Sequence, residues 1–337
     1  MIPAVVASAV VACLATYAVL RWLPQYGFVD VPNERSSHDT PTATLGGAGI
    51  LLGFLTGCVV YAHHTGEVAW ETGGVVAVAG TLALFARDEI RPLGRLTKLA
   101  IQGIAAALAV HLFGSLESLT LPLAGTLALS GWGPILTWFI YVTGQNIFNF
   151  MDGIDGLAGS EGLLAAAAFA VLLGMVHSVY APLPALIAGA CLGFLVWNLP
   201  SARVFMGDIG GHLLGLMLGA FVVLSERSGI PIWLAATVVG TFLFDGVYTI
   251  SRRALRGENI TMAHRFHLYQ RLVRIGWSHL VVDIVYGIHT VVFAAGVVAY
   301  VSGHRPFGFG LIATGLFSMT VATVLIERRW LQMGETS

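Results

Sequence analysis

A run of amide and carboxylate side chains, residues 145–159, leads into an apolar segment. Asn149 and Asp152 are three residues apart, as are Asp152 and Asp155, so these side chains share a face while the segment stays helical. Hard oxygen ligands suit Mg²⁺, which keeps several waters and takes only one or two protein carboxylates plus substrate phosphates. A structural helix end with Asp caps explains the glycines and one Asp here, but not two Asn and two Asp together.

A second carboxylate, Asp208, stands between glycines immediately before another apolar segment. A lone Asp in that place is most often a helix N-cap. Phe205 precedes it by three residues, where an aromatic ring could stack on a nucleotide base, although a Phe in isolation is more often packing.

An acidic pair, Asp88 and Glu89, is followed by a basic stretch that ends at Lys98. Basic clusters also attract anionic lipid head groups without any catalysis, so the arginines alone indicate little. The carboxylate pair is less easily explained in that way.

A polar loop over residues 261–272 contains His264, Arg265 and His267. Such side chains could hold a pyrophosphate through charge-assisted hydrogen bonds. The same stretch is also typical of an amphipathic interfacial helix, with Phe266 and Tyr269 dipping into lipid, and the two interpretations are compatible.

The composition predicts that these residues are carried by a membrane protein. Of 337 residues, 56% are hydrophobic and 10% charged, whereas soluble domains carry about 25% charged residues. Apolar runs near the roughly 20 residues needed to cross a bilayer recur along the chain. We therefore expect an all-α polytopic membrane protein with ten or eleven transmembrane helices in one domain, residues 1–337. The candidate spans are 2–20, 46–62, 68–86, 98–113, 134–150, 161–177, 183–198, 210–225, 231–250, 281–300 and 308–326.

Charge distribution predicts the orientation of these spans. The first run has no basic region before it and Arg21 just after it, which indicates a retained span with its N-terminus outside. With eleven crossings, the inner loops then hold all but Arg227 and Arg305 of the 17 Lys and Arg residues, in accordance with the positive-inside rule. The outer segment 114–133 could form a small hairpin around Gly125.

This topology places five acidic residues on the same face, in loops that we expect to be cytoplasmic. Acidic side chains in a membrane domain are costly unless they are paired, hydrated or bound to a cation, so the cluster indicates a site. The alternative is five separately solvated loop carboxylates. The net charge of -1 gives no indication of nucleic-acid binding, and we expect the three cysteines to be packing residues in apolar spans. The five acids are Asp88, Glu89, Asp152, Asp155 and Asp208.

Four motifs together resemble a known family, the polyprenyl-phosphate N-acetylhexosamine-1-phosphate transferases, which are related to the phospho-N-acetylmuramoyl-pentapeptide transferase of peptidoglycan synthesis. The resemblance covers nearly the whole chain. The segments that carry it are 30–38, 146–159, 205–208 and 264–270. Arg35 to His38 and the histidine loop look most like the branch that initiates O-antigen or other surface polysaccharides.

The resemblance implies a role for each matching residue. Asp208 would bind Mg²⁺ (or Mn²⁺) directly with Asn149 beside it, Asp88 would meet the acceptor phosphate, and Lys98 would neutralise charge on the transferring phosphates. Phe205 would stack on uracil, and Asp152 and Asp155 would line the nucleotide site. The expected catalytic residues are Asp88, Glu89, Lys98, His264, Arg265 and His267; the substrate-binding residues are Arg35, His38, Asn146, Asp152, Asp155 and Phe205; the metal ligands are Asn149 and Asp208.

Two positions depart from the family pattern. The family usually has Asp-Asp where this chain has Asp88-Glu89, and it often has Pro-Thr-Pro-Arg-Gly-Gly-Gly where residues 41–47 read Pro-Thr-Ala-Thr-Leu-Gly-Gly. Glu keeps the charge of Asp but moves it about one methylene further out, a shift that matters where groups must be positioned.

The resemblance implies the transfer of N-acetylhexosamine-1-phosphate from a UDP-sugar (GlcNAc, or a deoxy derivative such as FucNAc or QuiNAc) to undecaprenyl phosphate. The products would be undecaprenyl-diphosphate-sugar and UMP, made at the cytoplasmic face of a bacterial inner membrane. Relatives commonly form membrane-embedded dimers, so a homodimer is compatible with the resemblance. The alternatives are a transporter or flippase, a CDP-alcohol-type phosphotransferase and a catalytically inactive scaffold. The acids at span ends disfavour the transporter, and the residues after Gly156 disfavour the CDP-alcohol enzyme.

Overall fold

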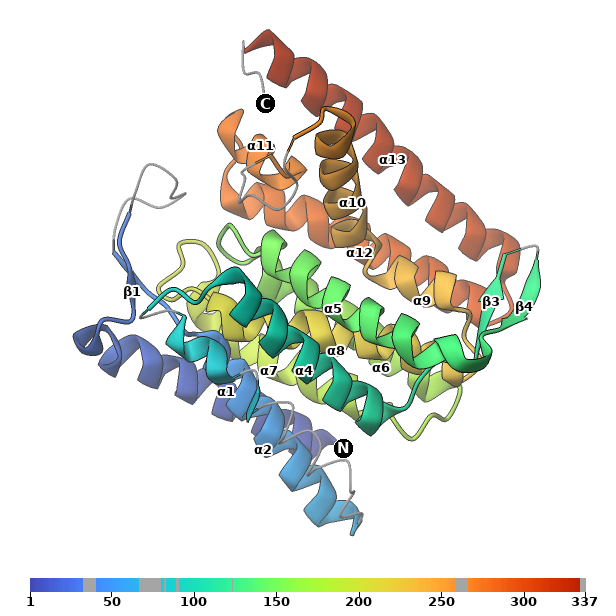
Figure 1. The fold of residues 1–337 in the computed structure, drawn as a ribbon, viewed down its shortest axis with the longest axis horizontal. Coiled ribbons are helices and arrows are strands. Elements are labelled where there is room, and N and C mark those ends of the chain that lie inside the picture. Colours follow the sequence, from blue (N-terminus) through green and yellow to red (C-terminus); the bar gives the residue numbers. More distant parts are fainter. Residues whose placement is uncertain are drawn as a thin grey trace.

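The computed structural model describes residues 1–32, 41–66, 80–81, 83–88, 91–122, 124–258 and 266–333. Within these residues the fold is a bundle of helices with two short two-stranded ribbons (Figure 1). Seven of the described helices are long and apolar enough to cross a membrane. The expected all-α polytopic class is therefore confirmed. These helices are α1 (Ile2–Trp22), α2 (Gly47–Thr65), α4 (Arg95–Phe113), α6 (Leu157–Met175), α8 (Gly207–Arg227), α12 (His279–Val301) and α13 (Arg305–Gln332).

Two further helices, α5 (Gly133–Met151) and α7 (Pro182–Asn198), also coincide with predicted spans. The predicted span 68–86 lies largely outside the described residues; at its end, helical residues 80, 81 and 83 precede the short 3-10 helix η2 (Leu84–Arg87). Helical structure throughout is what a bilayer demands, because it satisfies backbone N–H and C=O groups within the segment itself.

The straight span expected over 231–250 is instead a broken one. Helices α9 (Ile232–Val238) and α10 (Gly240–Leu255) meet at an angle of 90°. The apolar character that predicts a span is interrupted in α10 by Asp245, which is fully buried, and by Arg252 and Arg253 in the last turn. These groups need protein or water partners that a straight helix in lipid would not offer.

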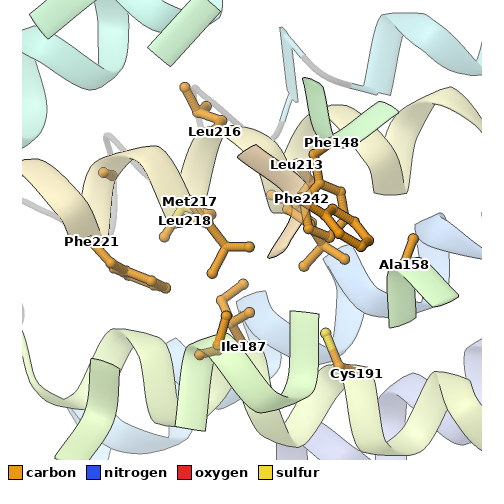
Figure 2. Packing of buried hydrophobic residues seen from close by; sticks show 14 of the residues in the cluster. Phe148, Ala158, Ile187, Cys191, Leu213, Leu216, Met217, Leu218, Phe221 and Phe242 are labelled. Atoms are coloured by element: carbon orange, nitrogen blue, oxygen red, sulfur yellow. The ribbon is translucent and has the colours of Figure 1, made fainter. Parts of the chain in front are cut away.

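Helix α8 lies at the centre of the bundle. Its most apolar stretch is 83% buried, against 28% in α1 and in α13, which therefore lie at the periphery. Figure 2 shows Leu213 and Phe221 of α8 in the same buried cluster as Ile187 and Cys191 of α7. Cys13, Cys58 and Cys191 are all unbridged, as expected for packing residues.

Glycines allow α5 and α8 to approach closely. A Cβ on Gly215 would lie 2.4 Å from the carbonyl oxygen of Gly144, so side chains at this crossing would push the two helices apart. Small residues serve this purpose at helix contacts in membranes. The contact fixes the end of α5 beside the beginning of α8.

Two ribbons complete the described fold. The expected hairpin is confirmed: β3 (Ser118–Leu121) pairs antiparallel with β4 (Gly125–Ala128), and Gly125 at the turn has φ +78°. The other ribbon joins β1 (Val29–Asp30) to β2 (Thr42–Ala43). The remaining short helices are η1 (Pro24–Tyr26), η3 (Ser130–Trp132) and α11 (Leu268–Arg274).

Candidate active site

Two carboxylates and one lysine, predicted from two separate motifs, meet in one cluster. Lys98, in the first turn of α4, places its Nζ 2.9 Å from Oδ2 of Asp208, at the beginning of α8. The same nitrogen pairs with Asp88, which follows η2. The side chains of Lys98, Asp88 and Asp208 are 33%, 13% and 21% exposed, so the cluster is accessible to a ligand. One cation therefore separates two carboxylates.

Asn149 joins this cluster from the last turn of α5. Its Nδ2 donates to Oδ1 of Asp208 at 3.3 Å. A Cβ on Gly211 would lie 2.3 Å from Oδ1 of Asn149, so the glycine leaves the space that the amide occupies. The expected pairing of Asn149 with Asp208 is thus present in the geometry.

The oxygen groups at this point fit a hard cation. Asp208, Asp88 and Asn149 offer carboxylate and amide oxygens, the ligand type that Mg²⁺ takes. Among the residues that the structure describes, no three His, Cys, Asp or Glu side chains converge as a metal cage.

The segment of Phe205 and Met206, which leads into α8, is held in place by residues at and before the start of α2. The backbone N–H of Phe205 donates to Ala43 O at 2.8 Å, and the N–H groups of Gly46 and Gly47 donate to the carbonyls of Phe205 and Met206. A Cβ on Gly47 would lie 2.3 Å from the backbone nitrogen of Gly210. The segment 41–47 therefore buttresses the beginning of α8, and the half-buried ring of Phe205 lies beside it.

Asp152 and Asp155 lie in the loop between α5 and α6. Asp152 is the C-cap residue of α5 and is half-buried. Oδ2 of Asp155 accepts a hydrogen bond from the backbone of Ala202 at 3.0 Å and lies 3.4 Å from Nδ1 of His279. Asp155 therefore links the loop after α5 to the segment around Ala202 and to the start of α12 (His279–Val301).

Asn146 lies one helical turn before Asn149, and its amide faces α4. Its Nδ2 donates to Oε1 of Gln102 at 2.9 Å, and Nε2 of Gln102 donates back to Oδ1 of Asn146 at 3.3 Å. This reciprocal pair ties α4 to α5. The substrate-binding role expected for Asn146 stays a prediction.

His267, the N-cap residue of α11, is buried against Asp245 of α10. Its Nδ1 lies 3.1 Å from Oδ1 of Asp245. The same carboxylate accepts from the backbone N–H groups of Leu268 and Tyr269 and from the hydroxyl of Tyr286 at 2.7 Å. A fully buried Asp thus caps α11 from a neighbouring helix.

Tyr269 connects this cap to the first motif. Its hydroxyl donates to the carbonyl of Phe150 at 3.1 Å. A Cβ on Gly153 would lie 2.1 Å from that hydroxyl oxygen, so the loop after α5 needs a glycine there. The chain from His267 onward is therefore attached to the end of α5. The predicted residues Arg35, His38, Glu89, His264 and Arg265 lie outside the described residues.

Sequence reasoning missed several residues that organise the cluster. Buried Asn198 accepts from the backbone of Gly156 at 3.1 Å and donates to the carbonyl of Val204 at 2.9 Å, which links the loop after α5 to the segment before α8. His212 lies one turn after Asp208, buried against Phe85 with ring centres 4.2 Å apart. The sequence contains a signal for two of the missed residues. His212 lies four residues after Asp208 and therefore on the same helix face, and Asp245 is an acidic residue within the predicted span 231–250, where an acid is costly unless it has a partner.

An apolar cavity of about 240 Å³ opens between α5, α8, α9 and α10. Gly144, Ile147 and Phe148 of α5 line it, and Ile147 and Phe148 lie between Asn146 and Asn149 in sequence. Phe148 and Phe242 approach with ring centres 5.1 Å apart at its wall (Figure 2). The cavity therefore shares α5 with Asn149, and none of Lys98, Asp88 and Asp208 lines it.

Comparison of the sequence with known proteins identifies the family of the chain. The family described as "Glycosyl transferase family 4" matches residues 72–226. The chain is 35% identical over 311 residues to a decaprenyl-phosphate N-acetylglucosaminephosphotransferase of Mycobacterium tuberculosis, covering 81% of this chain and 75% of the relative.

Two further relatives broaden the comparison. A protein of Bacillus subtilis described as a probable undecaprenyl-phosphate N-acetylglucosaminyl 1-phosphate transferase is 26% identical, over 83% of this chain and 79% of the relative. A phospho-N-acetylmuramoyl-pentapeptide-transferase of Pelagibacter ubique is 31% identical, over 79% and 81%. The chain is thus a multi-pass membrane protein that belongs to glycosyl transferase family 4, the family of polyprenyl-phosphate N-acetylhexosamine-1-phosphate transferases.

Proposed function

We propose that this chain transfers N-acetylglucosamine-1-phosphate, or the 1-phosphate of a deoxy relative such as FucNAc or QuiNAc, from a UDP-sugar to undecaprenyl phosphate. The observation that carries the proposal is the cluster of Lys98, Asp88 and Asp208, with Asn149 of α5 beside it. A charged cluster for phosphates, in a helix bundle that also holds an apolar cavity along α5, suits an acceptor with an anionic head and a prenyl tail. The names of the relatives support the same polyprenyl phosphate chemistry.

The reaction joins an oxygen of the acceptor phosphate to the β-phosphorus of the UDP-sugar. The bond from that phosphorus to the bridging oxygen breaks, and UMP leaves with that oxygen. Phosphoryl transfer depends mostly on positioning and charge neutralisation. The acceptor is already an anion, so a general base is optional. Asp88, which pairs with Lys98, would act on the acceptor as a base, as a nucleophile or as the group that orients it.

Each side chain of the cluster has a task in this proposal. Lys98 neutralises charge that develops on the transferring phosphate. Asp208, with Asn149 beside it, would hold Mg²⁺, which when bound supplies further positive charge at the pyrophosphate. Phe205 would stack on the uracil, and Asp152 and Asp155 would line the nucleotide site.

The proposal also includes residues that the structure does not describe, and their roles rest on the sequence motifs alone. Arg35 and His38 would contact the nucleotide. His264 and Arg265 would close over the sugar and pyrophosphate, while His267, which is buried on Asp245, would hold the end of their loop. The role of Glu89 belongs to the same proposal. With the active site facing the cytoplasm, a cytosolic UDP-sugar and a lipid of the inner membrane would meet there, and the product would start an O-antigen or another envelope polysaccharide.

The test uses purified full-length protein in detergent with undecaprenyl phosphate, Mg²⁺ and a panel of radiolabelled UDP-sugars. We expect lipid-linked product with at least one sugar, and its loss in Asp208→Ala. Glu117→Ala is the matched control, because Glu117 is an exposed acid that precedes the β3–β4 hairpin, away from the cluster. No product with any sugar, or undiminished product from Asp208→Ala, would refute the proposal.

A further inference from the structure

A second charged cluster lies where α10, α11 and α13 meet. Glu327 of α13 accepts a hydrogen bond from the hydroxyl of Tyr248 at 2.8 Å. Its Oε1 lies 3.1 Å from Nε of Arg252 and also pairs with Nη1 of Arg271. None of these residues belongs to the site described above. Two guanidinium groups therefore share one carboxylate.

The cluster carries an excess positive charge that the described residues do not neutralise. Arg271 is fully buried, and its guanidinium carbon lies 5.2 Å from the ring centre of Trp330. Nε and Nη2 of Arg271 and Nη1 of Arg252 have no hydrogen-bond acceptor among the described residues. A charge held in a low-dielectric setting is weakly screened and attracts an anion from nearby.

A cavity of about 300 Å³ adjoins Glu327 between α10 and α13. Phe244, Val324 and Leu331 give it apolar walls, and Arg328 lines its edge. Arg328 is exposed and takes part in none of the ion pairs found among the described residues. It lies near the end of α13, a candidate membrane span, where lipid head groups are expected.

We propose that this cavity binds an anionic phospholipid of the bilayer. One acyl chain lies along Phe244, Val324 and Leu331, and the phosphodiester lies against Arg328, drawn by the excess charge of Arg252 and Arg271. Free phosphate would leave the apolar walls unused, and a zwitterionic lipid brings no net charge to match the cluster. Basic pockets between membrane helices bind anionic head groups on this principle.

The site has a consequence for the rest of the molecule. Arg271 lies on α11, one turn after His267 at the N-cap of the same helix. A lipid that stabilises Arg271 and α10 also steadies the helix that begins at His267. The proposal does not depend on the transferase reaction, and it is tested without turnover.

Native mass spectrometry of the full-length protein in detergent provides the test, with phosphatidylglycerol and phosphatidylcholine of identical acyl chains. We expect wild-type protein to retain several-fold more phosphatidylglycerol than phosphatidylcholine. Arg328→Gln should lower phosphatidylglycerol retention about fivefold, the effect of one arginine at an anionic lipid. Arg329→Gln is the matched control, because Arg329 is also exposed on α13 but does not line the cavity, and it should bind as wild type.

Two further experiments separate the contributions of the lipid's acyl chain and of its head group. Val324→Trp, at an exposed cavity wall, should reduce retention of the lipid without changing any charge. Millimolar inorganic phosphate should leave the bound phosphatidylglycerol in place. Equal retention of the two lipids, equal effects of Arg328→Gln and Arg329→Gln, or full displacement by inorganic phosphate would each overturn the proposal.

Discussion

The ammonium nitrogen of Lys98 lies 2.9 Å from Oδ2 of Asp208, although the two residues are 110 positions apart in the chain. The same nitrogen pairs with Asp88. Because the lysine stands between two carboxylates, its removal leaves like charges facing each other and takes away the cation nearest the proposed phosphate site.

Replacing Lys98 with Gln should lower the rate of lipid-linked product formation about 10²–10³-fold, the cost of removing one group that stabilises transition-state charge. This rate is measured with radiolabelled UDP-GlcNAc and undecaprenyl phosphate as substrates. Arg95→Gln is the control, since Arg95 is an exposed cation at the start of the same helix, and it should retain activity. Wild-type rates in the Lys98 variant would remove this residue from the mechanism.

Chelation of divalent cations should abolish activity, and added Mg²⁺ should restore it. Asn149→Ala should raise the Mg²⁺ concentration for half-maximal activity about 10–100-fold, because Asn149 contacts the proposed metal-binding carboxylate of Asp208 at 3.3 Å. Titration of Mg²⁺ at saturating substrates gives this constant. An unchanged half-maximal concentration with a lowered maximum would instead assign Asn149 to the substrate.

Gly211→Ala should lower activity at least about tenfold with little loss of folded protein. The new Cβ would lie 2.3 Å from Oδ1 of Asn149 and force the amide to move, and misplacement of about 1 Å at an active site can cost about 10²-fold. Gly174→Ala is the matched control, because nothing lies within 4 Å of its Cβ in α6. Equal activities of the two variants would show that the position of Asn149 does not matter.

Asp245→Asn should destabilise the protein by on the order of 3 kcal/mol, since a neutral amide weakens several hydrogen bonds to the buried carboxylate. Thr249→Val removes only one of its donors, the 3.1 Å bond from Oγ1, and should cost about 1 kcal/mol. Thermal unfolding in detergent compares the two. We also expect activity to fall in Asp245→Asn, because His267 loses its partner; a variant as stable and active as wild type would contradict both expectations.

The sequence by itself predicted the class of fold and named the residues that meet in the candidate cluster, Asp88, Lys98, Asn149 and Asp208. Apolar length decides membrane crossing without reference to neighbours, because each helix satisfies its own backbone. The helical spans of α1, α8 and α12 therefore appear close to where they were expected. Asn149 and Asp208 could be identified as candidate site residues from the sequence, because the residue types that mark each motif lie within a short segment of chain.

Tertiary structure alone decided how these segments meet. The bend between α9 and α10 and the burial of His267 on Asp245 depend on partners elsewhere in the chain. So does the pairing of Asn146 with Gln102. The physical reason is packing: the close approach of Gly144 and Gly215 brings the end of α5 to the start of α8, and only then do Asn149 and Asp208 come within hydrogen-bonding distance.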